Sequence, residues 1–207
     1  MLNTWIAILS NQTRITLGTV FSGRTAPELE KIPGIMMNLL PVRADLSGNP
    51  DCREIRSRVK QAVSETYANQ DYPLDLLAHK LRKTIDLNRD IYSIMFIGQE
   101  RVERGIHFAG LQMESCPLVE FIYGRDEEEE GFLESPYRIQ QDMIVEMFED
   151  DEKIKFIVRY NNLRFKSQTI KHYFDRFKSA AQQFLDPANP RFSQLQPDEA
   201  SDLDELF

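Results

Sequence analysis

The chain has few side chains whose types and spacing suit catalysis. Its three histidines, His79, His107 and His172, stand far apart, and no Ser-His-Asp or Cys-His arrangement follows from their spacing. Cys52 and Cys116 are the only cysteines, which excludes a disulfide framework and a multi-cysteine metal cluster. Glycine-rich phosphate-binding loops and the Gly-x-Ser-x-Gly nucleophile motif are absent. We therefore expect no catalytic residue and no metal ligand among these 207 residues.

The distribution of charged residues indicates which kinds of binding partner to expect. Five acidic residues occupy positions 126 to 130, and five more lie between Asp198 and Glu205. Without those ten, 23 acidic residues face 25 basic ones, so the net charge of −8 belongs to one loop and one tail. The chain also lacks the basic stripe with interleaved aromatic residues that nucleic-acid-binding proteins carry. We expect no nucleic-acid partner and a solvated acidic loop rather than a cation site.

The apolar segments argue against a membrane protein. None approaches the roughly 18 residues that a membrane-spanning helix needs. The first twelve residues are apolar but lack the basic region and the cleavage site of a signal peptide. Together with the low cysteine count, this favours a cytoplasmic protein. The helical pattern is already complete at Leu2, without a capping residue before it, so we expect a truncated chain.

Two kinds of periodicity predict a mixed α/β fold. Alternating apolar residues predict strands at 14–22 and 38–46, and Pro41 within the second suggests an edge, a bulge or a bend. The almost entirely apolar segment 92–97 predicts a central strand. Segments 139–148 and 153–160 also alternate, and the acidic residues 149–152 between them predict an antiparallel hairpin.

Helical spacing of apolar residues predicts the covering helices. One helix follows Asp51, a break lies at Tyr72-Pro73, and a shorter helix begins at Leu74. The strongest stripe runs from Ile170 to Leu185, and the proline at 187 ends it. Residues 191–207 read as an acidic tail or linker. Strands and helices together predict a layered sheet with packed helices.

Four segments, in order, resemble motifs of the condensation domains of nonribosomal peptide synthetases. A helix, turn and strand end in Gly23-Arg24, and residues 69–77 are similar to the family's Gln-Asp-x-Pro motif. The segment 89–96 resembles a motif in which Arg-Asp precedes a strand that ends in Met-Phe. Residues 32–43 are similar to the Gly-x-x-x-Asn-x-x-Pro-x-Arg signature, whose members are Gly34, Asn38, Pro41 and Arg43.

The resemblance implies a fold and a domain boundary. Condensation domains resemble chloramphenicol acetyltransferase, a CoA-dependent acyltransferase, with two sandwich-like α/β lobes around the active site. Residues 1–190 resemble the C-terminal lobe alone, and residues 191–207 a tail or linker. The family's His-His-x-x-x-Asp-Gly signature belongs to the first lobe, and this sequence contains no such motif. The resemblance therefore implies a single lobe that is inactive without its N-terminal lobe.

The resemblance also implies roles for individual residues. In the family, the segment between Gly23 and Gly34 lies across the floor of the substrate channel. Asn38 and Arg43 either hold that loop by hydrogen bonds or are ordinary polar residues of a strand end. The members expected to form the channel floor or its structural motif are Gly23, Arg24, Gly34, Asn38, Pro41 and Arg43. The secondary motifs are Gln70, Asp71 and Pro73, which shape the helix break, and Arg89 and Asp90, which pair with each other or with a neighbour.

The function that the resemblance implies is amide-bond formation between two carrier-bound thioesters. Partner peptidyl carrier proteins would present both substrates on phosphopantetheine arms, and this chain would bind no cofactor directly. An adenylation domain would follow the tail. Two alternatives stay open: a non-catalytic remnant that binds carrier proteins, or a fragment of another acyltransferase of the same fold. A lobe made to pack on another should also expose an apolar face.

Overall fold

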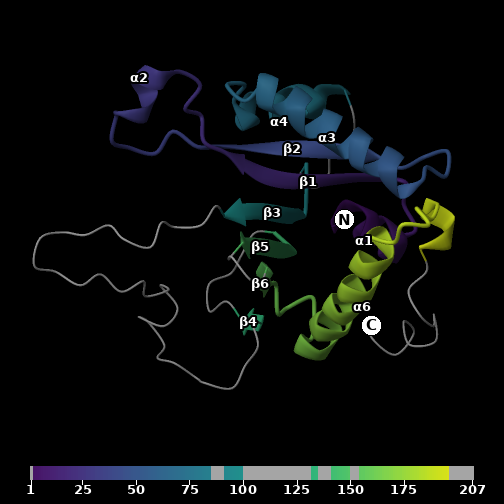
Figure 1. The fold of residues 1–207 in the computed structure, drawn as a ribbon. Helices are drawn as coiled ribbons and strands as arrows, with labels where there is room; N and C mark the ends of the chain where they lie inside the picture. Colours follow the sequence, from purple (N-terminus) through teal and green to yellow (C-terminus); the bar gives the residue numbers. More distant parts are fainter. Residues whose placement is uncertain (1, 85–90, 100–131, 135–140, 150–153, 196–207) are drawn as a thin grey trace, which may run out of the picture.

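One mixed sheet organises the chain. The computed structural model describes residues 2–84, 91–99, 132–134, 141–149 and 154–195, and Figure 1 shows their arrangement. The elements are α1 (Leu2–Ser10), β1 (Arg14–Phe21), α2 (Pro27–Glu30), β2 (Asn38–Asp45), α3 (Cys52–Ala68), α4 (Leu74–Thr84), β3 (Ile94–Gln99), β4 (Phe132–Glu134), β5 (Met143–Glu149), β6 (Ile154–Tyr160), α6 (Ser167–Phe184) and the 3-10 helix η1 (Phe192–Gln194).

The described strands form a six-stranded sheet in the order β2-β1-β3-β5-β6-β4. Strand β1 pairs antiparallel with β2 and parallel with β3, and β3 continues parallel to β5. The predicted antiparallel pairing of the two late strands is confirmed, because β5 and β6 pair over their full lengths. The turn expected between them lies largely outside the described residues. The mixed α/β sheet with packed helices is the predicted architecture.

Two strand positions follow from local sequence. Pro41 lies in β2, which is an edge strand of the described sheet. Of the edge, bulge or bend that the proline suggests, the structure shows the edge. The apolar segment expected at 92–97 gives the central strand β3, but the strand begins two residues later. Tyr92 precedes the strand, and its ring covers Gly18 so closely that a Cβ there would lie 2.3 Å from it. The tyrosine ring therefore packs on β1 before the chain enters the sheet.

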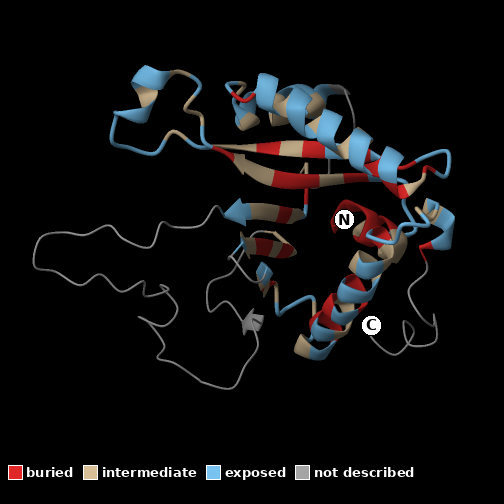
Figure 2. Cartoon of the chain, in the orientation of Figure 1, coloured by how far each residue is buried: buried red, intermediate tan, exposed pale blue. Residues whose placement is uncertain are grey.

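The main core lies between the sheet and α1, α3 and α6. Apolar side chains from these helices and from β1, β5 and β6 form one buried cluster. Figure 2 shows the buried stripe of α6, and Figure 1 shows this helix beside α1. Phe177 is at the centre of the aromatic contacts, with ring centroids 5.6 Å from Trp5, 5.6 Å from Phe156 and 5.3 Å from Phe174. The pairs with Trp5 and Phe156 are edge-to-face, and such pairs contribute beyond the burial of apolar area.

The start of α3 is fixed by a side-chain cap. Asp51 Oδ1 accepts a hydrogen bond of 2.8 Å from the backbone N–H of Glu54, three residues into the helix. This hydrogen bond is the main reason why the pKa of the Asp51 carboxyl lies below its ordinary value. The bonded carboxylate therefore stabilises the helix end that faces the C-terminal segment.

The segment that follows α6 packs onto the start of α3. The backbones of Arg191 and Asp51 form an isolated antiparallel β-bridge. The backbone N–H of Ser193 donates to Asn49 Oδ1 at 2.8 Å. Leu195 is buried against α1 and α6. Residues 191–195, which the sequence places in a tail, are therefore part of the folded body as the structure describes it.

Candidate functional site

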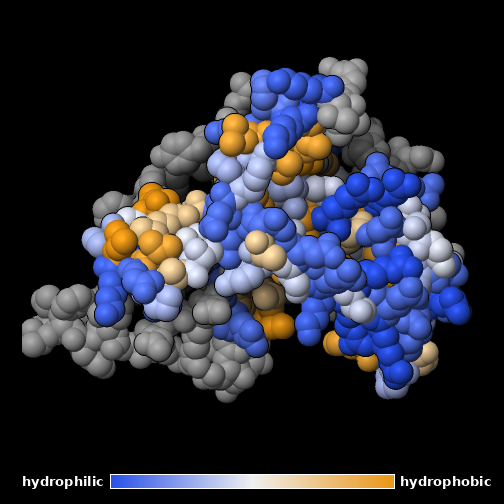
Figure 3. All heavy atoms as spheres, turned by 90° about the horizontal axis from the view of Figure 1, so that it is seen from above, coloured by the Kyte–Doolittle hydropathy of each residue, from blue (hydrophilic) through white to orange (hydrophobic). Residues whose placement is uncertain are grey.

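The most unusual described segment is the loop between β1 and β2, residues 22–37, called the β1–β2 loop below. It carries α2 and projects beyond the end of the sheet (Figure 1). Three of its large apolar side chains face solvent: Ile35 is 88% exposed, Met37 57% and Ile32 45%. Seen from above, apolar atoms gather over this loop at the left of the molecule (Figure 3). An exposed apolar group on an ordered loop is typical of an interaction surface.

Arg24 lies inside the β1–β2 loop and binds its backbone. The guanidinium Nη1 donates to the carbonyl of Leu29 and, at 3.0 Å, to that of Ile32. Its Nη2 donates to the carbonyl of Gly34 at 3.1 Å. One side chain thereby satisfies three backbone acceptors that span six residues. The loop is held by polar contacts, while its apolar side chains point outward.

Two glycines of the resemblance occupy backbone conformations that other residues rarely adopt. Gly23 has φ of +65°, and a Cβ there would lie 2.0 Å from the carbonyl oxygen of Met36. Gly34 has φ of +143°, in open space. The left-handed conformation requires glycine at both positions. At Gly23 the close approach of the two ends of the loop requires it as well.

Asn38 joins the foot of the β1–β2 loop to the turn between α3 and α4, residues 69–73, called the α3–α4 corner below. Its Nδ2 donates to the carbonyls of Gln70, at 2.9 Å, and Tyr72, at 2.8 Å. The described hydrogen bonds of the asparagine side chain therefore go to the α3–α4 corner, and they fix the foot of the loop against that corner. Two sequence motifs that lie more than 30 residues apart meet at this single side chain.

The α3–α4 corner combines a buried and an exposed part. Gln70 is 3% exposed, and its Oε1 has no hydrogen-bond partner among the described residues. Asp71 and Pro73 are exposed, and the carbonyl of Pro73 accepts the N–H of Leu77 in the first turn of α4. The proline thus starts the second helix at the break that the sequence predicts.

The remaining members of the signature lie on β2. Pro41 is opposite Gly18 in the β1–β2 pairing, and Arg43 is opposite Thr16. Arg43 is exposed, and its side chain makes no hydrogen bond within the part of the chain that the structure describes. It contributes a nearby positive charge to Asp45, whose pKa lies below its ordinary value mainly because Ser47 donates hydrogen bonds to the carboxylate. Arg43 therefore does not hold the loop.

Arg89 and Asp90 lie outside the described residues, so their predicted pairing stays a prediction. Sequence reasoning missed a different ion pair, in which Arg159 of β6 donates to Glu146 Oε2 of β5. Glu146 is 7% exposed, and alternation along β5 places it on the sheet face opposite the core. An acid inside an otherwise apolar strand was the available signal. Because Glu146 is buried, loss of the arginine would leave a buried carboxylate without its ion-pair partner, which is destabilising.

The described titratable groups do not form a catalytic constellation. His79 lies on the exposed side of α4, and His172 lies on α6. Cys52 is buried at the start of α3, and desolvation raises the pKa of its thiol, which favours the protonated form. No cluster of three or more metal-ligating side chains occurs in the described ranges. None of the helices described could cross a membrane.

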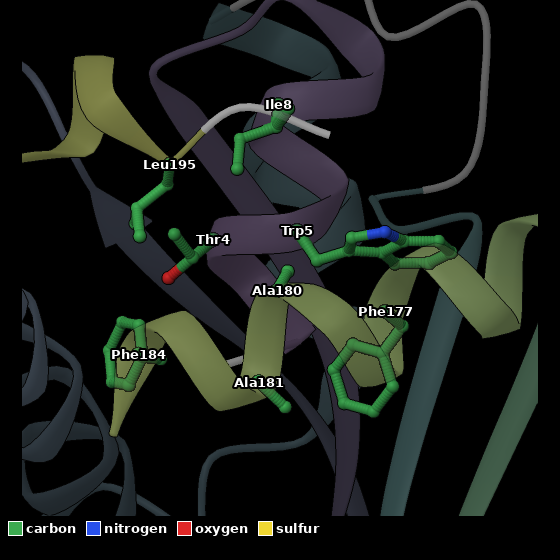
Figure 4. A pocket seen from close by; sticks show the side chains of 8 residues that line it. All are labelled: Thr4, Trp5, Ile8, Phe177, Ala180, Ala181, Phe184 and Leu195. Carbon is green, nitrogen blue, oxygen red and sulfur yellow. The ribbon is translucent and has the colours of Figure 1, made fainter. Parts of the chain in front are cut away.

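A small cavity between α1 and α6 is not a substrate site. Its volume is about 10 Å³, enough for no more than a water molecule. Figure 4 shows its lining of apolar side chains and the hydroxyl of Thr4. The residues that line this cavity are Thr4, Trp5, Ile8, Phe177, Ala180, Ala181, Phe184 and Leu195.

The surface around the β1–β2 loop and the α3–α4 corner is therefore the candidate site.

Known proteins resemble this chain over nearly its whole length. A family model described as the condensation domain matches residues 1–203. A linear gramicidin synthase of Brevibacillus parabrevis is 30% identical over 182 residues, which are 87% of this chain and 3% of that protein. Surfactin synthase subunit 2 of Bacillus subtilis (strain 168) is 26% identical over 184 residues, 86% of this chain and 5% of the relative. The chain therefore spans a small part of each curated relative.

Solved structures share the fold. The X-domain complex with OxyB from teicoplanin biosynthesis superposes with a TM-score of 0.67 and 20% identity, over 93% of this chain and 41% of that chain. The first condensation domain of the CDA synthetase also gives a TM-score of 0.67, with 12% identity, over 94% of this chain and 40% of the other. At these identities the likeness concerns the fold alone, and the matched part is less than half of each solved chain.

Proposed function

The chain belongs to the condensation-domain family, and from this premise we propose that it forms the C-terminal lobe of an enzyme that makes amide bonds in nonribosomal peptide synthesis. In the proposed reaction, the amine of a carrier-bound aminoacyl thioester attacks the carbonyl of a second, upstream thioester. A C–N bond forms, the C–S bond breaks, and the upstream carrier leaves as a thiol while the amine loses a proton. The relatives are named as synthases of linear gramicidin and of surfactin, which supports this reaction class.

The general base for this step is proposed to come from outside the 207 residues. The sequence contains histidines only at positions 79, 107 and 172, and no His-His pair. His79 and His172 lie on different helices, α4 and α6. The role of this lobe is then to build one wall of the channel and to position substrates there.

The observation that carries the proposal is the convergence of the signature residues on one surface. Gly23 and Arg24 shape the β1–β2 loop, and Asn38 joins its foot to Gln70 in the α3–α4 corner. We propose that this loop forms the channel floor. Its exposed apolar side chains suit contact with a second lobe, because such a contact would remove their apolar surface from water.

The partners and organisation follow as proposals from the same premise. The C-terminal lobe, predicted to end at residue 190, would extend to residue 195, because residues 191–195 pack onto the folded body. It would be joined to an N-terminal lobe, and a linker at 196–207 would lead to an adenylation domain. Peptidyl carrier proteins would bring both substrates on phosphopantetheine arms, in the cytoplasm. The chain itself would hold no cofactor.

The coding DNA upstream of Met1 tests the proposal at the level of the gene. We expect the reading frame to continue and to encode a lobe that contains His-His-x-x-x-Asp-Gly. A stop codon in frame, with no such lobe encoded nearby, would contradict an amide-forming function. The second candidate, a non-catalytic remnant that binds carrier proteins, would then be favoured by the lack of a histidine pair in this sequence.

A further inference from the structure

The contacts of Arg24 are unusual for a half-exposed arginine. All its hydrogen bonds from the guanidinium go to backbone carbonyls of the β1–β2 loop, those of Leu29, Ile32 and Gly34. The loop also contains two carboxylates, Glu28 and Glu30, yet within the described part of the chain neither forms an ion pair with Arg24. The loop is thus built around the guanidinium rather than around a charge pair.

The chemistry of the three acceptors requires an arginine. A guanidinium presents five N–H donors in a rigid plane, so that Nη1 and Nη2 can reach different carbonyls at once. A lysine ammonium is a single point charge on a flexible chain and reaches fewer of them in one position. The three carbonyls lie before, at and after the turn that leads from α2 to Gly34. Their common donor therefore fixes the shape of the whole loop.

The shape of the loop determines where its apolar side chains point. Ile35 follows Gly34 directly, and Gly34 is the acceptor at 3.1 Å from Arg24. Met37 precedes Asn38, which is fixed on the α3–α4 corner by two hydrogen bonds. The exposed pair Ile35 and Met37 is therefore held between two polar anchors, one on each side. Loss of either anchor frees one end of this apolar segment.

We propose that Arg24 is a positioning residue of the amide-forming reaction, which holds the β1–β2 loop in the one conformation that presents Ile35 and Met37 to the substrate channel. Arg24 acts through the loop and touches no reacting atom. The catalytic half of this statement rests on the proposed function. The structural half, control of the loop by a guanidinium, stands on the three hydrogen bonds alone.

Hydrogen exchange of the full chain tests the structural half. In Arg24→Gln, we expect amide exchange in the peptide covering residues 25–37 to be about tenfold faster, because the loop loses charge-assisted hydrogen bonds. Arg24→Lys should give an intermediate rate. The matched control is Arg43→Gln, which removes an exposed arginine of the neighbouring strand that makes no described hydrogen bond. Equal exchange rates in Arg24→Gln, Arg43→Gln and the native chain would overturn the proposal.

Steady-state kinetics of the full-length protein test the catalytic half. With both carriers loaded, Arg24→Gln should lower kcat for amide formation about tenfold and leave the KM for each carrier unchanged, since the loop acts after the carriers dock. Arg24→Lys should recover part of the rate, and all variants should melt within a few degrees of the native protein. Faster loop exchange with an unchanged kcat would overturn the positioning role. If the native protein forms no amide, the proposed function and this role both fail, while the exchange result still decides whether Arg24 shapes the loop.

Discussion

Two regions of the molecule, the β1–β2 loop and the core beneath α6, are ordered by different forces. In the core, Phe177 is 4% exposed and packs its ring against three other aromatic residues. In the loop, Ile35 is 88% exposed, and order comes from hydrogen bonds that Arg24 donates to backbone carbonyls. A substitution that changes the volume of a side chain in the aromatic core disturbs all its neighbours. The hydrogen bonds of the loop come from single side chains, so each can be removed by one substitution. The difference suggests that stability depends on the core and function on the loop.

The largest effect should come from the core. Phe177→Ala removes a ring from the centre of the aromatic cluster, and we expect unfolding to become easier by about 3–5 kcal/mol. Leu185→Ala is the control, because Leu185 is 67% exposed and its truncation should change stability by less than about 0.5 kcal/mol. Denaturant unfolding followed by circular dichroism measures both. Equal losses in the two variants would erase the contrast between core and surface.

Glycine substitutions sharpen the comparison within loops. Gly23→Ala combines a left-handed φ with a collision at the Met36 carbonyl, and should cost about 2–3 kcal/mol. Gly48→Ala has a similar φ of +82° but open space around it, and should cost about 1 kcal/mol. The same unfolding measurement separates strain from collision. If Gly48→Ala proves as harmful as Gly23→Ala, the close approach of the loop ends is not what demands glycine.

The link between the loop and the α3–α4 corner should be weaker than either collision or core packing. Asn38→Ala removes both donors to the Gln70 and Tyr72 carbonyls and should cost about 1–2 kcal/mol. Asn69→Ala removes one exposed bond to the Glu65 carbonyl and should cost about 0.5 kcal/mol. Thermal melts rank the two. An Asn38→Ala protein as stable as the native chain would show that the link contributes nothing to stability.

The smallest effect is a pH dependence at the start of α3. The pKa of Asp51 is lowered in the folded chain, so its contribution to stability is present above the unfolded pKa of about 3.9 and is lost as the pH falls through the lower folded value. Asp51→Asn keeps an acceptor for the Glu54 N–H but removes the charge. We expect its denaturation midpoint to fall less than that of the native chain between pH 6 and pH 3. Parallel loss in both proteins would assign the acid sensitivity to other carboxylates.

Local patterns predicted the parts of the fold that local forces decide. Pro41 indicated an edge, a bulge or a bend, because a proline lacks the N–H that a central strand uses, and the structure shows the edge. The alternation in β5 and β6 predicted their antiparallel pairing. The start of β3 was predicted two residues early, since the ring of Tyr92 resembles a strand residue in sequence but packs on Gly18 of a different strand.

Contacts between distant residues were beyond the reach of periodicity. The docking of residues 191–195 depends on Asn49, more than 140 positions earlier, and no local signal marks that pairing. Of the candidate site, the motif resemblance selected Gly23, Arg24 and Asn38, but their partners became visible only in the fold. The sequence offers no sign that Arg24 binds three carbonyls, because a backbone acceptor has no residue type.

The proposed role of this chain, as the second lobe of an amide-forming enzyme, is tested most directly with the full-length protein. One carrier is loaded with an acyl thioester and the other with an aminoacyl thioester. Mass spectrometry of the downstream carrier should show the combined acyl-aminoacyl group, and the upstream carrier should return as a free thiol. Two carriers that keep their original loads, in the presence of folded protein, would contradict the claim.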